Sequence, residues 1–193
     1  MEDKEKEYYN TFEHNLEQEL IRLCSTYGLL DRKFLLTDDH IAKWKELAPE
    51  YMADAVKQIN DYPGAAIAWA GYIGMAIAKW WDMDWTKYSG YGYDALNGKR
   101  GFDDMDDHIV QDILGYRLGS EEARQIEGIM STCSQKAIDM IRKENIEAQT
   151  TKAFYILART VSVMYRLGVS LMLKKLGYAF QKISTDAISS LKS

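Results

Sequence analysis

The residue types that most often build compact reactive sites are scarce in this chain of 193 residues. The two cysteines, Cys24 and Cys133, cannot form a disulfide framework or a cysteine-based tetrahedral zinc site. None of the three histidines lies three residues after a glutamate, so the Glu-x-x-His pair of ferritin-like di-iron bundles is missing. No serine–histidine or cysteine–histidine arrangement can be read from the spacing, and the sequence therefore assigns no catalytic residue.

Proline is also rare, and sustained alternation of apolar and polar residues is absent. Pro49 and Pro63 are the only prolines, and apolar residues recur at steps of three and four along most of the chain. This spacing is typical of amphipathic helices and excludes a sheet-based core. We predict one all-α domain over residues 1–193, a bundle of about six or seven helices, with residues 178–193 as a loosely docked tail.

The expected helix boundaries follow from apolar stripes and capping residues. Thr37 or Asp38 is expected to cap a short second helix, Pro49 to start a third, and residues 60–63 to break the chain. Gly28 is expected to stop the first helix. That helix carries a single stripe made of Tyr9, Phe12, Leu16, Leu20, Leu23, Tyr27 and Leu30.

Two long apolar segments, residues 63–87 and 148–176, are predicted to be the central pair of helices. Residues 64–78 contain no charge and are rich in alanine and glycine. Gly71 and Gly74 would each cost an isolated helix about 1 kcal/mol relative to alanine, which indicates a packing reason for them. The uncharged run is shorter than the ~20 residues that a membrane span needs, so we expect no membrane insertion.

The formal net charge of −5 is unevenly distributed. Residues 148–193 hold seven basic residues and one acid, a net charge of +6, which leaves −11 on the rest of the chain. This asymmetry predicts first that the two parts complement each other within the molecule, and we do not expect nucleic-acid binding. The charged start of the chain has no apolar segment typical of a secretory signal, so we expect a cytoplasmic protein.

The densest unusual feature spans residues 80–112, which contain eight aspartates. Asp104, His108 and Asp112 are spaced by four and would share one helix face, and Asp82 or Asp84 could complete the set. Oxygen and imidazole ligands of this kind suit a divalent metal, so these residues form our predicted metal site.

Helix capping is an alternative explanation for the same aspartates. Asp103 is a good N-cap residue for a helix expected over 103–116, and Asp106 stands three residues later, as in a capping box. Acidic residues in a first turn also complement the helix dipole without any metal.

Aromatic residues and a glycine-rich loop occupy the same region and predict a ligand-binding surface. Trp81, Trp85, Tyr91 and Tyr93 lie close in sequence, and residues 88–102 form the longest loop inside the chain. Exposed aromatic side chains beside a loop could stack on a ligand or bind a protein partner. Packing of the loop over the end of the bundle explains them equally well.

Basic residues spaced by seven form a stripe on the last long helix. Lys152, Arg159 and Arg166 share one side of it, and the residues around them are mostly apolar. The stripe is either a narrow solvated face, or Arg159 and Arg166 point into a groove and meet carboxylates or an anionic ligand.

Several familiar motifs fail on their context. Residues 82–86 match the Asp-x-Asp-x-Thr pattern of haloacid-dehalogenase phosphotransferases, but a helix rather than a β-strand is expected before them. The same segment lacks the glycine and glutamate of an EF-hand, and residues 92–100 have the wrong length for a phosphate-binding P-loop.

These observations favour a binding or assembly module over an enzyme. The expected partners are a second copy of the chain, a helical protein or an anionic small molecule. An all-α, Mg²⁺-dependent hydrolase acting on a phosphorylated substrate is the alternative, supported only by the aspartates near the loop.

Overall fold

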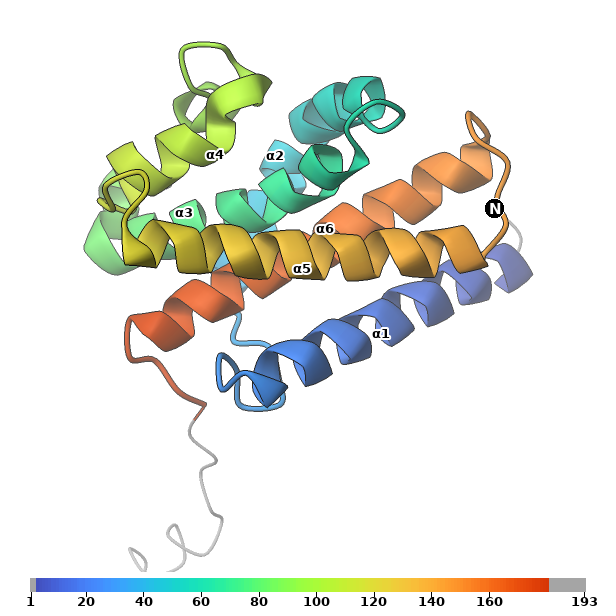
Figure 1. Ribbon diagram of the computed structural model, residues 1–193, viewed down its shortest axis with the longest axis horizontal. Coiled ribbons are helices and arrows are strands. Elements are labelled where there is room, and N and C mark those ends of the chain that lie inside the picture. The colour runs from blue at the N-terminus through green and yellow to red at the C-terminus, as the bar shows by residue number, and fades with distance from the viewer. Residues whose placement is uncertain (1–2, 181–193) are drawn as a thin grey trace, which may run out of the picture.

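The computed structural model describes residues 3–180 and contains six α-helices (Figure 1). They are α1 (Asp3–Thr26), α2 (Asp38–Gln58), α3 (Pro63–Tyr88), α4 (Met105–His108), α5 (Glu121–Lys143) and α6 (Thr151–Lys175). No β-strand occurs within residues 3–180, and the predicted all-α fold is confirmed. Most of the predicted tail, residues 181–193, lies outside the described residues.

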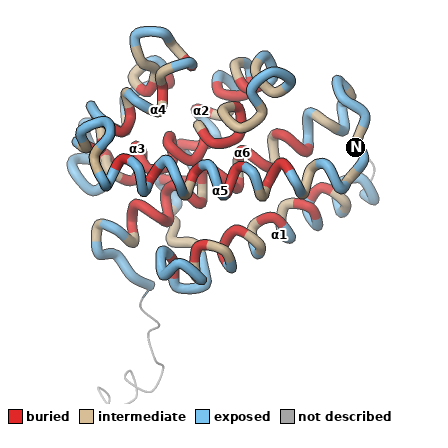
Figure 2. Tube along the Cα trace, viewed as in Figure 1, coloured by how far each residue is buried: buried red, intermediate tan, exposed pale blue. Residues whose placement is uncertain are grey.

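Helices α3 and α6 form the centre of the bundle, as predicted, and the other long helices cover them (Figure 2). All of residues 66–78 in α3 are buried except Trp69. Two contacts show that the two helices run in the same direction. Gly71 of α3 meets Gly168 of α6, and later in both segments Asp82 meets Tyr178. The core therefore depends on two segments that are about 60 residues apart in the sequence.

Glycines bring the backbones of α3 and α6 into direct contact. A Cβ atom on Gly168 would overlap the carbonyl oxygen of Gly71. A Cβ atom on Gly74 would overlap the carbonyl oxygen of Tyr165 in the same way. The contact explains why the central helix tolerates the unfavourable helix propensity of these residues.

Helix α2 differs from the prediction, because Pro49 lies in its interior rather than at the start of a third helix. One buried face, formed by Trp44, Leu47, Tyr51 and Ala55, continues across the proline. Burial of this face offsets the lost backbone hydrogen bond, so a single helix replaces the two that were expected. The predicted break does occur between Gln58 and Pro63.

The expected helix over residues 103–116 is wrong in detail. The segment is divided into a 3₁₀ turn (Phe102–Asp104), the single turn of α4 and a π-helical turn (Ile109–Ile113). Asp103 is exposed and does not cap it. Gly115, with a φ of 80°, ends the segment in the left-handed region.

Helix α6 is the only helix in the described range that is long and apolar enough, by length and composition, to cross a membrane. In this structure, 78% of its most apolar 18-residue window is buried inside the bundle. Such burial is typical of a core helix.

The start of α2 contains a fully buried histidine. Thr37 is the N-cap residue, as predicted, and its backbone N–H donates to Nδ1 of His40 (3.1 Å). The other ring nitrogen, Nε2, is buried without a hydrogen-bond partner in the described structure. Burial lowers the pKa of His40 from 6.5 to about 4, and the negative charge of Asp39 opposes this change.

We expect Gly168→Ala to lower the free energy of unfolding by at least about 3 kcal/mol, because α3 and α6 must separate to admit the methyl group. Gly128→Ala on α5 is the matched control: its Cβ would meet no atom within 4 Å, and it should stabilise the protein by about 0.5–1 kcal/mol. Urea denaturation measures both changes. Equal stabilities for the two alanine variants would contradict the proposed backbone contact.

The protein should also become less stable as His40 is protonated. Since the folded pKa of about 4 lies below the unfolded value of 6.5, the unfolded chain binds more protons between these values. The contribution of neutral His40 to the free energy of unfolding is complete above pH 6.5, and it falls by about 3 kcal/mol as the pH drops to 4. The variant His40→Asn keeps an acceptor for the backbone N–H of Thr37 but has no side chain that titrates. The difference between its free energy of unfolding and that of the wild type should therefore change over this pH range. A pH-independent difference in denaturation experiments would contradict the assignment.

Candidate functional site

The carboxylate of Asp104 is occupied by the adjacent turn. The backbone N–H of Arg100 donates to both of its oxygens, at 3.0 and 3.2 Å. Gly98 lies so close that a Cβ atom there would overlap the carboxylate. Asp104 therefore fixes the turn over residues 98–101, a role that neither the metal prediction nor the capping alternative described.

His108 links two segments through both ring nitrogens. Nε2 donates to the carbonyl oxygen of Ala95 (3.0 Å), and Nδ1 lies 2.8 Å from a carboxylate oxygen of Asp112. His108 and Asp112 are therefore in contact, although the segment that carries them is not the continuous helix that was expected. Both nitrogens are engaged in these contacts, so in this conformation the imidazole holds the loop around Ala95 against α4.

Asp82 and Asp84 point into other contacts at the end of α3. Asp82 accepts a hydrogen bond from the hydroxyl of Tyr178 (2.8 Å), which ties the chain after α6 to α3. Asp84 has extended backbone angles and accepts from the backbone N–H of Lys87 (3.2 Å), so it caps the last turn of the helix after a kink.

The predicted metal ligands are therefore not assembled into one set in this structure. Among residues 3–180, no group of three histidine, cysteine, aspartate or glutamate side chains is arranged to hold a metal ion. Metal binding at Asp82, Asp84, Asp104, His108 and Asp112 stays a prediction, and it would require a rearrangement of the contacts described above.

The predicted ligand-binding aromatics also serve the bundle itself. Nε1 of Trp81 donates to Asp39 (3.0 Å), and its ring lies against His40 and Tyr178. Tyr93 is buried, and its hydroxyl donates to Asp54 (3.0 Å). Burial and the nearby carboxylate raise the pKa of Tyr93 well above its ordinary value, so it stays a neutral donor.

Trp85 and Tyr91 complete the aromatic set without forming an open stacking surface. Trp85 is half-buried against the core. Tyr91 is 38% exposed and contacts Trp80 and Tyr88 edge-on. These contacts match the alternative that the loop packs over the end of the bundle, and no cavity among those identified is lined by Trp81, Trp85, Tyr91 or Tyr93.

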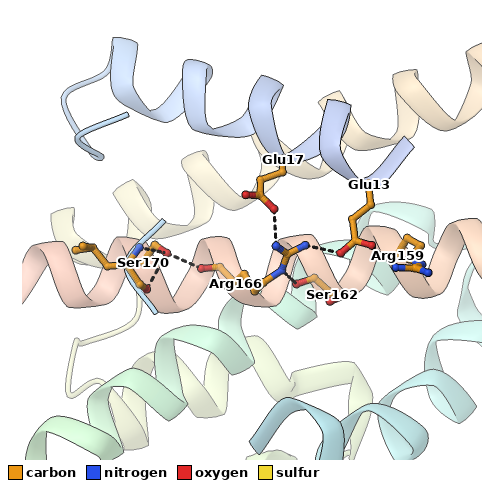
Figure 3. Close-up of polar contacts among 7 residues, drawn as sticks. Glu13, Glu17, Arg159, Ser162, Arg166 and Ser170 are labelled. Atoms are coloured by element: carbon orange, nitrogen blue, oxygen red, sulfur yellow. Dashed lines mark hydrogen bonds and ion pairs between the residues drawn. The ribbon is translucent and has the colours of Figure 1, made fainter. Parts of the chain in front are cut away.

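Arg159 and Arg166 point at α1 and meet its carboxylates, as Figure 3 shows. Arg159 binds Glu13 at 2.5 Å, and Arg166 binds the other oxygen of Glu13 at 2.7 Å. Arg166 also forms an ion pair with Glu17. The two arginines therefore meet carboxylates, as in one of the two alternatives that the sequence left open, and these carboxylates come from the chain itself.

Two lysines of α6 also contact the segment of residues 8–31. The ammonium group of Lys152 lies 4.3 Å from the ring centroid of Tyr8. Lys174 pairs with Asp31 at 2.5 Å. The charge asymmetry of the sequence is thus met partly by contacts between α6 and the segment of residues 8–31, as predicted.

A groove that the sequence analysis did not identify opens beside the end of α1. It has a volume of about 590 Å³. Its apolar lining comes from four segments: Tyr27 and Leu29 after α1, Met75 of α3, Ile126 and Ile129 of α5, and Leu171 and Met172 of α6. We call this surface the α1/α5/α6 groove. Its size falls within the range of ligand pockets, about 300–1,000 Å³.

Gly128 of α5 lines the α1/α5/α6 groove and has no packing reason to be glycine. Its φ is not in the left-handed region, and an added Cβ would meet nothing within 4 Å. Glycine in a helix interior costs about 1 kcal/mol relative to alanine. The absence of a side chain at this position leaves the wall of the groove open.

The rim of the groove is basic. Lys174 and Lys175 line it at the end of α6, and no acidic residue is among its lining residues. Helical spacing alone could not reveal the groove, because Gly128 reads as a neutral interruption until the neighbouring helices are in place. A second apolar groove of about 450 Å³ lies where α2, α5 and α6 end or begin, near Val56 and Phe154.

Comparison of the chain with family models, curated proteins and solved structures found no match.

We expect Arg166→Met to lower the free energy of unfolding by about 2–4 kcal/mol, because Glu13 and Glu17 would lose a half-buried partner. Arg159→Met should cost less, since Arg159 binds only Glu13. Lys136→Met is the control, because the Lys136–Glu19 pair also joins two helices but is more exposed, and it should cost less than about 1 kcal/mol. Urea denaturation distinguishes them. The prediction is wrong if the Arg166 and Lys136 variants are equally stable.

Proposed function

We propose that the protein is a binding module that takes an amphipathic helix of a partner protein into the α1/α5/α6 groove. The observation that carries the proposal is the open apolar wall at Gly128 between two exposed helix ends. An apolar helix face laid into such a groove would bury its side chains against Ile126, Ile129 and Leu171, the usual mode of helix recognition.

The charge of the rim determines which helix fits best. Lys174 and Lys175 line one end of the groove, no acidic residue is among its lining residues, and Lys174 also pairs with Asp31 outside the lining. A partner helix that carries glutamates or aspartates beside its apolar face complements this rim, while a basic helix is repelled. Of the partners expected from the sequence, this proposal takes the helical protein and assigns it an acidic face.

Catalysis has less support. Asp104 and His108 fix turns in the segment of residues 95–108, and no metal-capable group of side chains forms within the described residues. The Mg²⁺-dependent hydrolase is therefore not the function we propose. We further propose that the module works in the cytoplasm, in keeping with two unpaired thiols at Cys24 and Cys133.

Two synthetic peptides of about 18 residues test the proposal directly. Both carry leucines at i, i+3, i+4 and i+7; one has glutamates and the other lysines at the remaining positions. We expect saturable binding of the glutamate peptide, measured by fluorescence anisotropy, and at least about 10-fold weaker binding of the lysine peptide.

Variants locate the binding surface. Gly128→Leu should weaken binding of the glutamate peptide at least about 10-fold by filling the groove, while Gly128→Ala should leave it nearly unchanged. Ser131→Leu is the matched control, because it adds the same side chain at an exposed position of α5 outside the groove. Circular dichroism verifies that each variant is folded. Equal binding to the wild type and Gly128→Leu, or no binding of either peptide, would refute the proposal, and light scattering would show whether a second copy occupies the groove instead.

A further inference from the structure

Cys24 and Cys133 lie in contact although they are 109 residues apart in the sequence. Cys24 is on α1 and Cys133 on α5, and their sulfur atoms are 3.6 Å apart. Both side chains are fully buried. These are the only cysteines of the chain, so each thiol has one possible partner within the molecule.

The pair is one of the contacts between α1 and α5, and it lies next to the α1/α5/α6 groove. Gly28, which follows α1, and Thr132, which precedes Cys133, both line the α1/α5/α6 groove. A covalent link at the pair would fix the end of α1 against α5.

We propose that Cys24 and Cys133 are a redox-active pair that forms an intramolecular disulfide on exposure to peroxide. The thiolate of one cysteine attacks an oxygen of hydrogen peroxide, and hydroxide leaves to give a sulfenic acid. The sulfur of the other cysteine then attacks the sulfenic sulfur, and its thiol proton passes to the sulfenic hydroxyl group, which leaves as water. Overall, two thiols and one peroxide give one disulfide and two waters, with a two-electron oxidation of the sulfur atoms.

The 3.6 Å contact between the sulfur atoms places either thiol within reach of a sulfenic acid formed on the other. Because both are buried, oxidant reaches them only when the end of α1 opens locally, and the reaction rate should follow that opening.

Peroxide treatment of the reduced, folded protein tests the inference. We expect loss of both free thiols, a mass lower by two hydrogens, and a non-reduced peptide map that joins residues 24 and 133. The linked protein should unfold about 5–15 °C higher, and dithiothreitol should reverse the change.

A variant with a displaced cysteine tests whether the disulfide requires the contact between the two sulfur atoms or only the presence of two reactive thiols. Cys133→Ser combined with Thr132→Cys keeps two thiols but moves one to an exposed neighbouring position of α5. It should form the intramolecular disulfide at least about 10-fold more slowly. Thiols that stay free in the wild type, oxidation to sulfinic acid without a disulfide, or equal rates in the displaced variant would each overturn the inference. None of these readouts depends on peptide binding, so the result is independent of the proposed function.

Discussion

The fold depends on the direct contact between the backbones of α3 and α6. Glycines at positions 71, 74 and 168 remove the side chains that would otherwise hold the two helices apart. The close approach lets α3 bury almost every residue between 66 and 78. With α3 enclosed, the remaining helices need only one apolar face each, and their outer faces can carry the charges of the chain.

The polar groups of the molecule are mostly used to attach peripheral segments to this centre. Glu13 and Glu17 attach α1 to Arg166, and Ser170 accepts the backbone N–H of Leu35 from the segment that follows α1 (Figure 3). Asp104 and His108 instead join parts of the segment after α3 to one another, through the backbone of Arg100 and Ala95. Residues that look reactive in the sequence thus act largely as structural anchors.

The sequence was a good guide where one physical effect dominates. Apolar spacing located the central helices, and Thr37 and Gly28 marked helix ends because capping is a local interaction. It failed at Pro49, where burial of a face that spans the proline outweighs the local rule. It also failed at residues 103–116, which form a 3₁₀ turn, a single α-helical turn and a π-helical turn in place of one helix. The partners of Arg166 and the groove beside Gly128 depend on how helices meet, which no single segment encodes.

The order of the central helices along the chain has a consequence for biosynthesis. Helix α3 leaves the ribosome well before α6, the helix that must cover its glycine-lined face. At about 5–20 residues per second, the apolar segment 64–78 waits several seconds for its partner. During that interval the nascent chain exposes an uncharged surface, and this makes α3 the segment on which a chaperone would act.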